Sequence, residues 1–534
     1  MTSPSTTATT VDGVFRERLA AEPDRPFVAC GGGWLTFAEL DERTDRLATG
    51  LARLGVRRGD HIATLLPNRI ETVELLLAVA KLGAVQVPLN YFLKGDFLEY
   101  QLIDCGAKVF VADGPGYAAA GPLLDRTDVA ERVYVDAVEP GGVAYSDLLT
   151  ERSTFEPSAR PADLFTIMYT SGTTAAAKGC MLSTGYFVAV GRAYGLRNWV
   201  VPGDRMYTGF PMFHTSGQMV AFMSALVNGA SIGIAPEFHA SSFMREAAEM
   251  DATMLVGVGV MANMILEQPP AADDGAHPFR LASWVPLPEE RQREFETRFA
   301  TPVMSEGYGQ TECVPVTNSD PYGVRKRSSS GQVSPLLAAS IVDDDGNEVP
   351  TGESGEIVVR PTVPNAMYSG YWNKPESTVE AWKDLWHHTG DFGRMDADGI
   401  ITFVDRKKDV LRRRGENVSS LALENVIREH PAVADVAVCG LPSKLGDEDI
   451  KACVVLSAGA SLTAAEFFAF VEERVPYFAV PRYVDLRAGL PTNALGRVMK
   501  HVLRDEGVPP GTWDLPSQGL VARRTGRPTT AAAQ

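Results

Sequence analysis

The segment FTIMYTSGTTAAAKGCML, residues 165–182, carries the most information about the fold, because an apolar strand pattern runs directly into small hydroxyl residues and glycine. Such a loop lets backbone N–H and hydroxyl groups turn toward phosphate oxygens, and Lys178 adds a cation. The GxxxxGK[ST] spacing of a Walker loop is absent. The segment therefore predicts an anion site at the end of a strand, although by itself it also fits a Ser/Thr-rich surface loop.

Helical and strand patterns alternate on the N-terminal side of this segment. Residues 37–55 and 71–83 carry apolar side chains at helical spacing, and the short apolar runs HIATLLP and AKVFVAD read as strands. Gly55 and Gly83 stand where left-handed helix caps are expected. This alternation predicts an α/β fold with mostly parallel sheets.

The sequence pattern changes after about residue 331, where short apolar runs are separated by Gly and Asp. The runs SIVDDDGNEVP, GEIVVR and GIITFVDR predict short strands joined by tight turns, and residues 422–475 predict a smaller α+β unit. We expect a disordered tail at 1–10, an N-terminal domain at 11–404, a hinge at 405–408, a mobile C-terminal domain at 409–516 and a second disordered tail at 517–534.

Composition excludes several classes of function. The formal charge of −17 argues against nucleic-acid binding, since a polyanion needs clustered Lys and Arg. The six cysteines show neither metal-ligand spacing nor a disulfide framework. The longest apolar run is too short to cross a bilayer, and no secretory signal is recognisable, so we expect no membrane insertion and a cytoplasmic protein. A monomer and a homodimer are both compatible with the sequence.

Four further motifs follow the first in a fixed order: PMFH at 211–214, GYGQTE at 307–312, HHTGD at 387–391 and VDRKKDVLRRRGENVS at 404–419. Together with TSGTT and Lys178 they resemble the adenylate-forming superfamily, most closely its carnitine- and crotonobetaine-type CoA ligases and related ligases and diazotases of specialised metabolism. The resemblance spans about residues 15–504. It implies a large N-terminal domain of doubly wound sheets plus a β-rich subdomain, and a small mobile α+β C-terminal domain.

The resemblance also implies roles for individual residues. ATP would be bound by Tyr308 at adenine, by Asp391 and Arg406 at ribose or phosphate, and by hydroxyls, backbone and a cation at the phosphates, from Thr170, Ser171, Gly172, Thr173, Thr174, Lys178 and Thr311. Glu312 would hold Mg²⁺, which offsets charge as the α-phosphate is attacked. Lys408 would be the hinge residue.

The acid site is expected near His214, Gly307 and Trp284. His214 would position substrate rather than transfer a proton. Trp284 stands where many relatives have glycine, so its indole would fill the volume of a long acyl chain and favour a small or flat acid; the alternative is that the ring packs into the core.

The most informative departure from the family pattern is Arg497, which follows Gly496 where relatives carry lysine. That lysine bridges the substrate carboxylate and the α-phosphate in the transition state. Three alternatives stay open: Arg497 performs the role, Lys500 reaches in from three residues later, or the acid is activated without this bridge.

Three functions are therefore considered. The first is an ATP-dependent ligase that activates a small acid as its adenylate, releases pyrophosphate and passes the acid to CoA. The second keeps adenylation but uses an amine acceptor, or activates nitrite for attack by an arylamine; Trp284 and Arg497 motivate it. The third is a nucleotide-binding relative without turnover.

Overall fold

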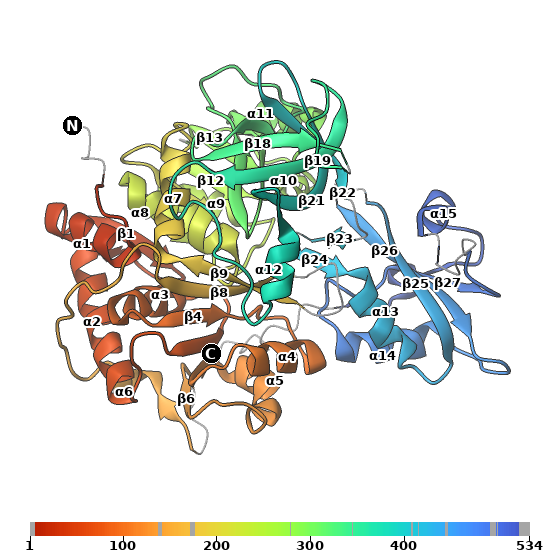
Figure 1. The fold of residues 1–534 in the computed structure, drawn as a ribbon, viewed down its shortest axis with the longest axis horizontal. Helices are drawn as coiled ribbons and strands as arrows, with labels where there is room; N and C mark the ends of the chain where they lie inside the picture. The colour runs from red at the N-terminus through yellow and green to blue at the C-terminus, as the bar shows by residue number, and fades with distance from the viewer. Residues whose placement is uncertain are drawn as a thin grey trace.

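The computed structural model describes residues 6–136, 141–170, 177–277, 279–343, 345–406, 410–414, 416–443, 447–491, 498 and 500–522. Its elements form the α/β architecture expected from the sequence, with three large sheets in the N-terminal part and a smaller sheet in the C-terminal part. Figure 1 shows the C-terminal elements gathered at one end of the molecule, with the hairpin β23–β24 between them and the rest.

Two seven-stranded sheets, parallel except at one edge, form the body of the N-terminal part. The first has the order β14-β13-β12-β10-β11-β1-β2 and the second β7-β6-β5-β3-β4-β8-β9. Their strands are β1 (Pro26–Cys30), β2 (Leu35–Thr36), β3 (His61–Leu65), β4 (Val85–Pro88), β5 (Val109–Ala112), β6 (Glu131–Tyr134), β7 (Val143–Ala144), β8 (Leu164–Thr170), β9 (Lys178–Ser183), β10 (Arg205–Thr208), β11 (Ser231–Ile234), β12 (Met254–Gly257), β13 (Leu281–Trp284) and β14 (Val303–Met304).

A third, antiparallel sheet corresponds to the predicted β-rich unit. Its order is β15-β16-β17-β22-β21-β19-β18, with β20 paired to β21. These strands are β15 (Gly307–Gln310), β16 (Cys313–Asn318), β17 (Gly331–Val333), β18 (Leu337–Val342), β19 (Ser354–Pro361), β20 (Trp382–Lys383), β21 (Trp386–Met395) and β22 (Ile400–Arg406).

The C-terminal part holds the hairpin β23 (Val410–Arg413) and β24 (Glu416–Ser419), followed by the sheet β25-β26-β27-β28. The strands of that sheet are β25 (Val433–Pro442), β26 (Glu448–Leu456), β27 (Tyr483–Arg487) and β28 (Trp513–Asp514). The predicted hinge at 405–408 falls on the last two residues of β22 and on residues 407 and 408, and Lys408 lies outside the described residues. The domain boundary at 404–408 stays a prediction.

Helices cover the sheets. They are α1 (Val11–Ala21), α2 (Phe37–Arg53), α3 (Ile70–Leu82), α4 (Gly95–Asp104), α5 (Gly114–Leu124), α6 (Tyr145–Leu148), α7 (Thr184–Gly195), the π-helix η1 (Ser216–Met223), α8 (Ser224–Asn228), α9 (Phe243–Glu249), α10 (Gly259–Leu266), α11 (Glu289–Phe299), α12 (Pro375–Ala381), α13 (Ser420–Arg428), α14 (Ala464–Arg474), α15 (Lys500–Asp505) and the 3₁₀ turn η2 (Pro516–Gln518).

Local sequence explains where several elements begin and end. Thr36 and Glu39 form a reciprocal capping box at the start of α2, and Gly83 ends α3 with φ 63°. The predicted disordered tail at 1–10 needs correction, because Thr6 and Thr7 donate hydrogen bonds to Glu17 of α1. The predicted tail after residue 516 likewise begins with the ordered turn η2.

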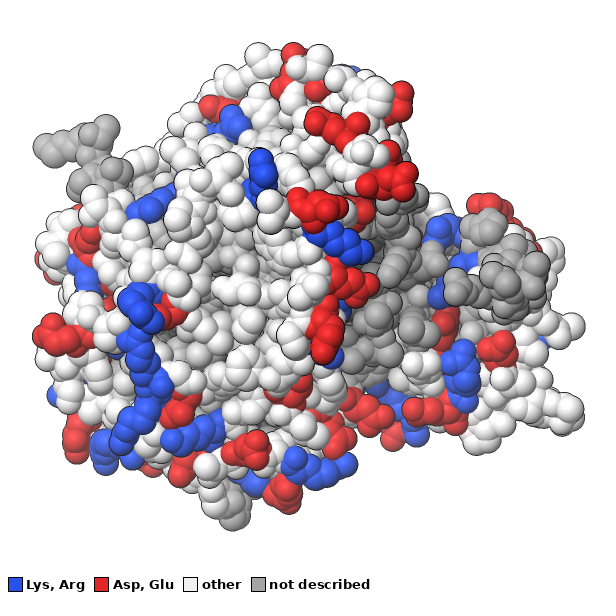
Figure 2. Space-filling view, in the orientation of Figure 1, with Lys and Arg blue, Asp and Glu red and all other residues white. Residues whose placement is uncertain are grey.

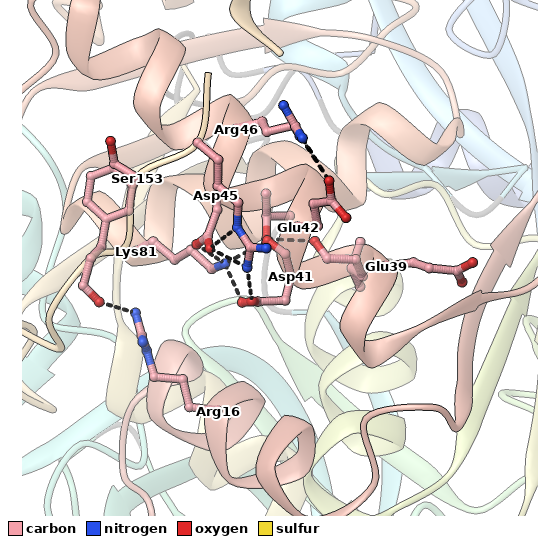
Figure 3. A network of polar contacts seen from close by, with 12 residues as sticks. Arg16, Glu39, Asp41, Glu42, Asp45, Arg46, Lys81 and Ser153 are labelled. Atoms are coloured by element: carbon pink, nitrogen blue, oxygen red, sulfur yellow. Dashed lines mark hydrogen bonds and ion pairs between the residues drawn. The ribbon is translucent and has the colours of Figure 1, made fainter. Parts of the chain in front are cut away.

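A buried ion-pair network joins α2, α3 and the segment after α6. Lys81 has a side chain only 1% exposed, and its Nζ lies 2.7 Å from Oδ1 of both Asp41 and Asp45. Arg152 bonds the second oxygen of each carboxylate. Figure 3 shows Lys81 pointing between the two aspartates. The network keeps the buried ammonium paired, which burial requires.

Charges of both signs lie on the face shown in Figure 2. Lys and Arg side chains form a narrow column at the left with acidic side chains beside it, and Asp and Glu side chains gather at the upper right. None of the helices in the described part of the chain combines the length and the apolarity needed to cross a bilayer.

Candidate active site

Two adjoining cavities lie where the sheets and the C-terminal part meet. The central cavity, of about 570 Å³, is lined by residues that include Tyr194, Trp199, Phe210, Ser283, Glu306, Gly307, Tyr308, Asn318, Asp391 and Arg412. The interdomain cavity, of about 340 Å³, is lined by residues that include Thr170, Phe213, His214, Thr311, Glu416, Leu423 and Val475. Both linings share Ser216, Val220, Gly309 and Val314, so the two spaces adjoin.

Tyr308 and Asp391, which lie far apart in sequence, meet in the central cavity. The Tyr308 hydroxyl donates to Asp391 Oδ2 over 2.7 Å, and Gln310 Nε2 donates to the same oxygen over 2.6 Å. Burial, reinforced by the Asp391 carboxylate, raises the pKa of Tyr308 well above its usual range, so the phenol stays a neutral donor.

The sequence analysis missed Gln310. It lies two residues after Tyr308 in β15, and alternation along a strand puts such residues on one face. The spacing of Tyr308 and Gln310 within the GYGQTE motif could therefore have indicated that both side chains lie at the same site. Arg406 pairs with Asp391 in the register of β21 and β22, which brings its backbone to the same place.

Thr170 and Thr311 line the interdomain cavity. The Thr311 hydroxyl lies 3.0 Å from that of Thr215, and Thr170 ends β8 beside the start of β9. Lys178 opens β9, and its ammonium lies 4.8 Å from the centre of the Tyr371 ring. The other predicted phosphate-loop residues lie outside the described part of the chain; these are Ser171, Gly172, Thr173 and Thr174.

Glu312 is largely buried and accepts a 2.8 Å hydrogen bond from the Tyr371 hydroxyl. Burial and the Glu312 charge raise the pKa of Tyr371, so this phenol also remains a donor. Among the described residues, no three His, Cys, Asp or Glu side chains converge as a metal site. One carboxylate beside a hydroxyl still fits Mg²⁺, which proteins commonly hold through one or two carboxylates and substrate phosphates.

The turn that precedes η1 fixes the position of His214. The Asn68 side chain makes two hydrogen bonds to the backbone of this turn: its Oδ1 accepts from the Met212 N–H, and its Nδ2 donates to the Phe210 carbonyl. His214 Nε2 then lies 2.8 Å from Glu416 of β24, a residue 202 positions away. Loss of hydration lowers the pKa of His214, but the Glu416 charge and hydrogen bond outweigh this and raise it above its usual value.

The Glu416 contact brings the hairpin β23–β24 to the cavities. Asn90 Nδ2 also donates to Glu416, over 3.4 Å, and Arg412 lines the central cavity. Arg413 instead points into the C-terminal part, where it donates to the Val480 carbonyl and burial lowers its pKa to about 10. The basic run of the hairpin is therefore divided between the cavity and the small domain.

The comparisons agree with this architecture. Residues 15–372 match the family of AMP-binding enzymes, and residues 422–497 match the AMP-binding enzyme C-terminal domain. The chain belongs to the AMP-binding enzyme family. Crotonobetaine/carnitine–CoA ligase of Salmonella agona (strain SL483) is 31% identical over 509 residues, which cover 92% of this chain and 97% of that relative.

Two solved structures are similar over nearly the whole AMP-binding enzyme. A double mutant of o-succinylbenzoate CoA synthetase from Bacillus subtilis, bound to a product analogue, has a TM-score of 0.82 at 26% identity and covers 92% of this chain and 98% of its own. The amide bond synthetase McbA from Marinactinospora thermotolerans has a TM-score of 0.84 at 24% identity, with coverages of 93% and 100%.

Four predicted site residues whose side chains are described belong to neither cavity lining: Lys178, Trp284, Glu312 and Lys500. The Trp284 ring is fully buried among Phe243, Phe295 and other core residues, and it belongs to neither cavity lining. It packs directly behind Gly257, where an added Cβ would come within 2.3 Å of the ring. The prediction that the indole fills the acid pocket is therefore wrong, and the core alternative describes the structure.

Lys500 faces its own domain. Its Nζ lies 2.6 Å from Glu424 Oε1 and donates to the Ser420 hydroxyl over 2.7 Å, both on α13. In this arrangement Lys500 does not reach either cavity lining. Arg497 and the Arg406 side chain lie outside the described part of the chain.

Proposed function

We propose that this AMP-binding enzyme activates a small acid with ATP and transfers the acyl group to CoA. The observation that carries the proposal is that one cavity is lined both by the hydrogen-bonded pair Tyr308 and Asp391 and by the aromatic residues Tyr194, Trp199 and Phe210. A nucleotide at the pair and an acid against the aromatic residues would be held within one enclosure. Holding two reactants in a fixed geometry is a large part of catalysis of a bimolecular step.

In the first half-reaction a carboxylate oxygen of the acid attacks the α-phosphorus of ATP, and the bond to pyrophosphate breaks. We assign Asp391 to the ribose hydroxyls and Tyr308 to the adenine, and Thr170, Thr311 and Lys178 to the phosphates. Arg497 is proposed to stabilise the charge that develops between carboxylate and α-phosphate. Glu312 and Thr311 would hold Mg²⁺, which when bound neutralises phosphate charge.

In the second half-reaction the CoA sulfur attacks the acyl carbon, the carbon–oxygen bond to AMP breaks, and the thiol proton passes to solvent. The interdomain cavity supports CoA as acceptor because it adjoins the central cavity and has apolar walls from both parts of the chain, including Phe213, Leu423 and Val475. This shape suits a slender thiol-bearing chain. His214, held by Glu416, would position the reacting groups.

One of the two residues that suggested nitrite as a substrate, Trp284, no longer supports that alternative. Trp284 lies in the core, so its indole does not block the pocket against a carbon skeleton. A cavity of about 570 Å³ with aromatic walls offers far more contact than nitrite can use. Amine acceptors and a turnover-free nucleotide-binding role stay as outcomes of the test.

The test incubates purified protein with ATP and Mg²⁺ against short aliphatic acids, aromatic acids and nitrite, each with and without CoA. AMP and acyl-CoA are measured by mass spectrometry. We expect AMP with a carboxylic acid and an acyl-CoA when CoA is present. AMP with nitrite alone, an amide formed only with an added amine, or ATP binding without pyrophosphate release would each contradict the proposal.

A further inference from the structure

Both backbone polar groups of Met212, two residues before His214, are bound by buried side-chain amides. The Met212 N–H donates to Asn68 Oδ1 over 2.8 Å, and the Met212 carbonyl accepts from Gln218 Nε2 over 2.7 Å. Asn68 comes just before α3, whereas Gln218 belongs to η1, and both residues are buried. The turn that leads to His214 is therefore held by two different elements.

The Gln218 amide is itself held by Gln86 of β4. Gln86 Nε2 donates to Gln218 Oε1 over 2.8 Å, and Gln218 Nε2 donates back to Gln86 Oε1 over 3.3 Å. Gln86 Nε2 also donates to the hydroxyl of Thr166, its register partner in β8, over 3.0 Å. A glutamine amide has two N–H donors, and both glutamines use both of them. Neither amide can turn over without losing hydrogen bonds, so the series from the sheet to Met212 has one fixed direction.

The helix η1 packs closely against the same turn. An added Cβ at Gly217 would come within 2.3 Å of the Pro211 carbonyl oxygen, so the helix approaches the turn as only glycine allows. A π-helical turn of this kind occurs frequently at functional sites. Ser216 and Val220 of η1 line both cavities. The buried amides therefore fix the part of the chain at which the two cavities adjoin.

The amide side chains themselves belong to neither cavity lining. They are thus placed to act through the turn rather than on a substrate. At the end of this turn His214 Nε2 lies 2.8 Å from Glu416 of the hairpin β23–β24. Hydrogen bonds weaken steeply when their distance and angle change, so this contact depends on the exact position of the turn.

We propose that Gln86 and Gln218 are positioning residues for the second half-reaction, because they hold the turn at which His214 meets Glu416. The inference rests on the proposed function, since that half-reaction belongs to it. Neither glutamine takes part in bond making. Their replacement should therefore disturb the contact between His214 and Glu416 before it disturbs the binding of ATP or acid.

The first test measures the pKa of His214 by NMR of histidine-labelled protein, with His214→Ala to assign its signal. Glu416 holds this pKa above its usual value in the wild type, so loss of the contact should lower it. Gln218→Met removes the amide and keeps a flexible side chain that fills the same space. We expect the pKa of His214 to be lower in Gln218→Met, and also in Gln86→Met, than in the wild type.

The second test compares the rate of thioester formation with the rate of pyrophosphate exchange. We expect the ratio of the two rates to fall by about fivefold in Gln218→Met, the scale of a partly exposed ion pair. Adding Glu416→Gln to Gln218→Met should lower the ratio no further than Glu416→Gln alone, because both changes act on one contact.

The control is Lys81→Met, which breaks a buried polar network that lies in neither cavity lining. It should lower stability but leave the pKa of His214 and the rate ratio as in the wild type. An unchanged pKa in the glutamine variants, an equal shift in Lys81→Met, or additive losses with Glu416→Gln would each overturn the inference.

Two further outcomes are separable from these. If Gln218→Met does not fold, Gln86→Met decides, because it removes the partner that orients the Gln218 amide and leaves the bond to Met212 in place. If the wild type forms no thioester, the proposed function fails, and the pKa of His214 in the same variants still tests whether the amides position this residue.

Discussion

Lys500 and its partners lie within one domain, so a rotation of that domain carries all three together. Its ammonium is bound by Glu424 and Ser420, and a rigid-body movement does not release it. We therefore predict that Arg497, not Lys500, supplies the charge in adenylate formation. Arg497→Ala should lower acid-dependent exchange of pyrophosphate into ATP by about 10²-fold or more, as for loss of one transition-state donor.

Lys500→Met provides the comparison, and it should change the exchange rate far less than Arg497→Ala does, because the Lys500 ammonium lies in neither cavity lining. A large loss in Lys500→Met with little loss in Arg497→Ala would reverse the assignment. Losses in neither would favour activation without a bridging cation. Melting temperatures of both variants separate misfolding from lost chemistry.

At the same scale, Trp284 illustrates what the sequence contained and what it did not. Ser283 and Trp284 are neighbours in β13, and strand alternation sends adjacent side chains to opposite faces. Alternation therefore puts only one of the two in the cavity, and the structure gives that position to Ser283. The choice between the two faces depends on which helices cover the sheet, and this was not readable from a local pattern.

At the scale of elements, the hairpin β23–β24 is bound at the cavities by the contact between His214 and Glu416. We predict that Glu416→Gln slows thioester formation about fivefold while leaving pyrophosphate exchange nearly unchanged. The magnitude corresponds to about 1 kcal/mol, the upper end for a partly exposed ion pair. Glu429→Gln, an exposed change on the same domain, is the control.

The contact also predicts a pH dependence. Glu416 raises the pKa of His214, so the charged pair is complete below the ordinary pKa of histidine and is lost as pH rises through the raised value. The thioester step should fall relative to pyrophosphate exchange across that alkaline limb, and Glu416→Gln should flatten the fall. A wild-type ratio that stays constant with pH would contradict this account of the hairpin.

At the scale of the whole molecule, the Lys81 network binds helices of the N-terminal part to one another (Figure 3). Lys81→Met leaves Asp41 and Asp45 with Arg152 as their remaining partner in the network. We expect a loss of about 3 kcal/mol of stability, because removing one partner uncovers buried charge. The measurement is the melting temperature by differential scanning calorimetry.

Lys383→Met is the matched control, since this lysine is exposed on β20. Its effect should stay within about 0.5 kcal/mol. Equal shifts of the melting temperature in Lys81→Met and Lys383→Met would show that the buried network contributes no stability beyond that of an exposed lysine. The triple change of Lys81→Met with Asp41→Asn and Asp45→Asn should recover part of the loss, because the uncovered charges are then absent.

The sequence predicted the α/β class, the β-rich unit and the C-terminal α+β unit, because periodicity and turn residues are local signals. Capping at Thr36 and the left-handed Gly83 show how directly those signals act. The ordered motifs also indicated Tyr308, Asp391 and His214. The meeting of His214 with Glu416, 202 residues apart, and the buried amide pair of Gln86 and Gln218 depend on tertiary packing, so no local pattern could reveal them.

Acid-dependent exchange of labelled pyrophosphate into ATP without CoA, followed by addition of CoA, tests the central claim most directly. The account predicts exchange with an aromatic or short carboxylic acid, and then conversion of the bound adenylate into a thioester with one AMP released for each thioester formed. ATP binding without exchange for any acid would contradict adenylate formation. Exchange that proceeds normally while CoA yields no thioester would contradict CoA as the acceptor.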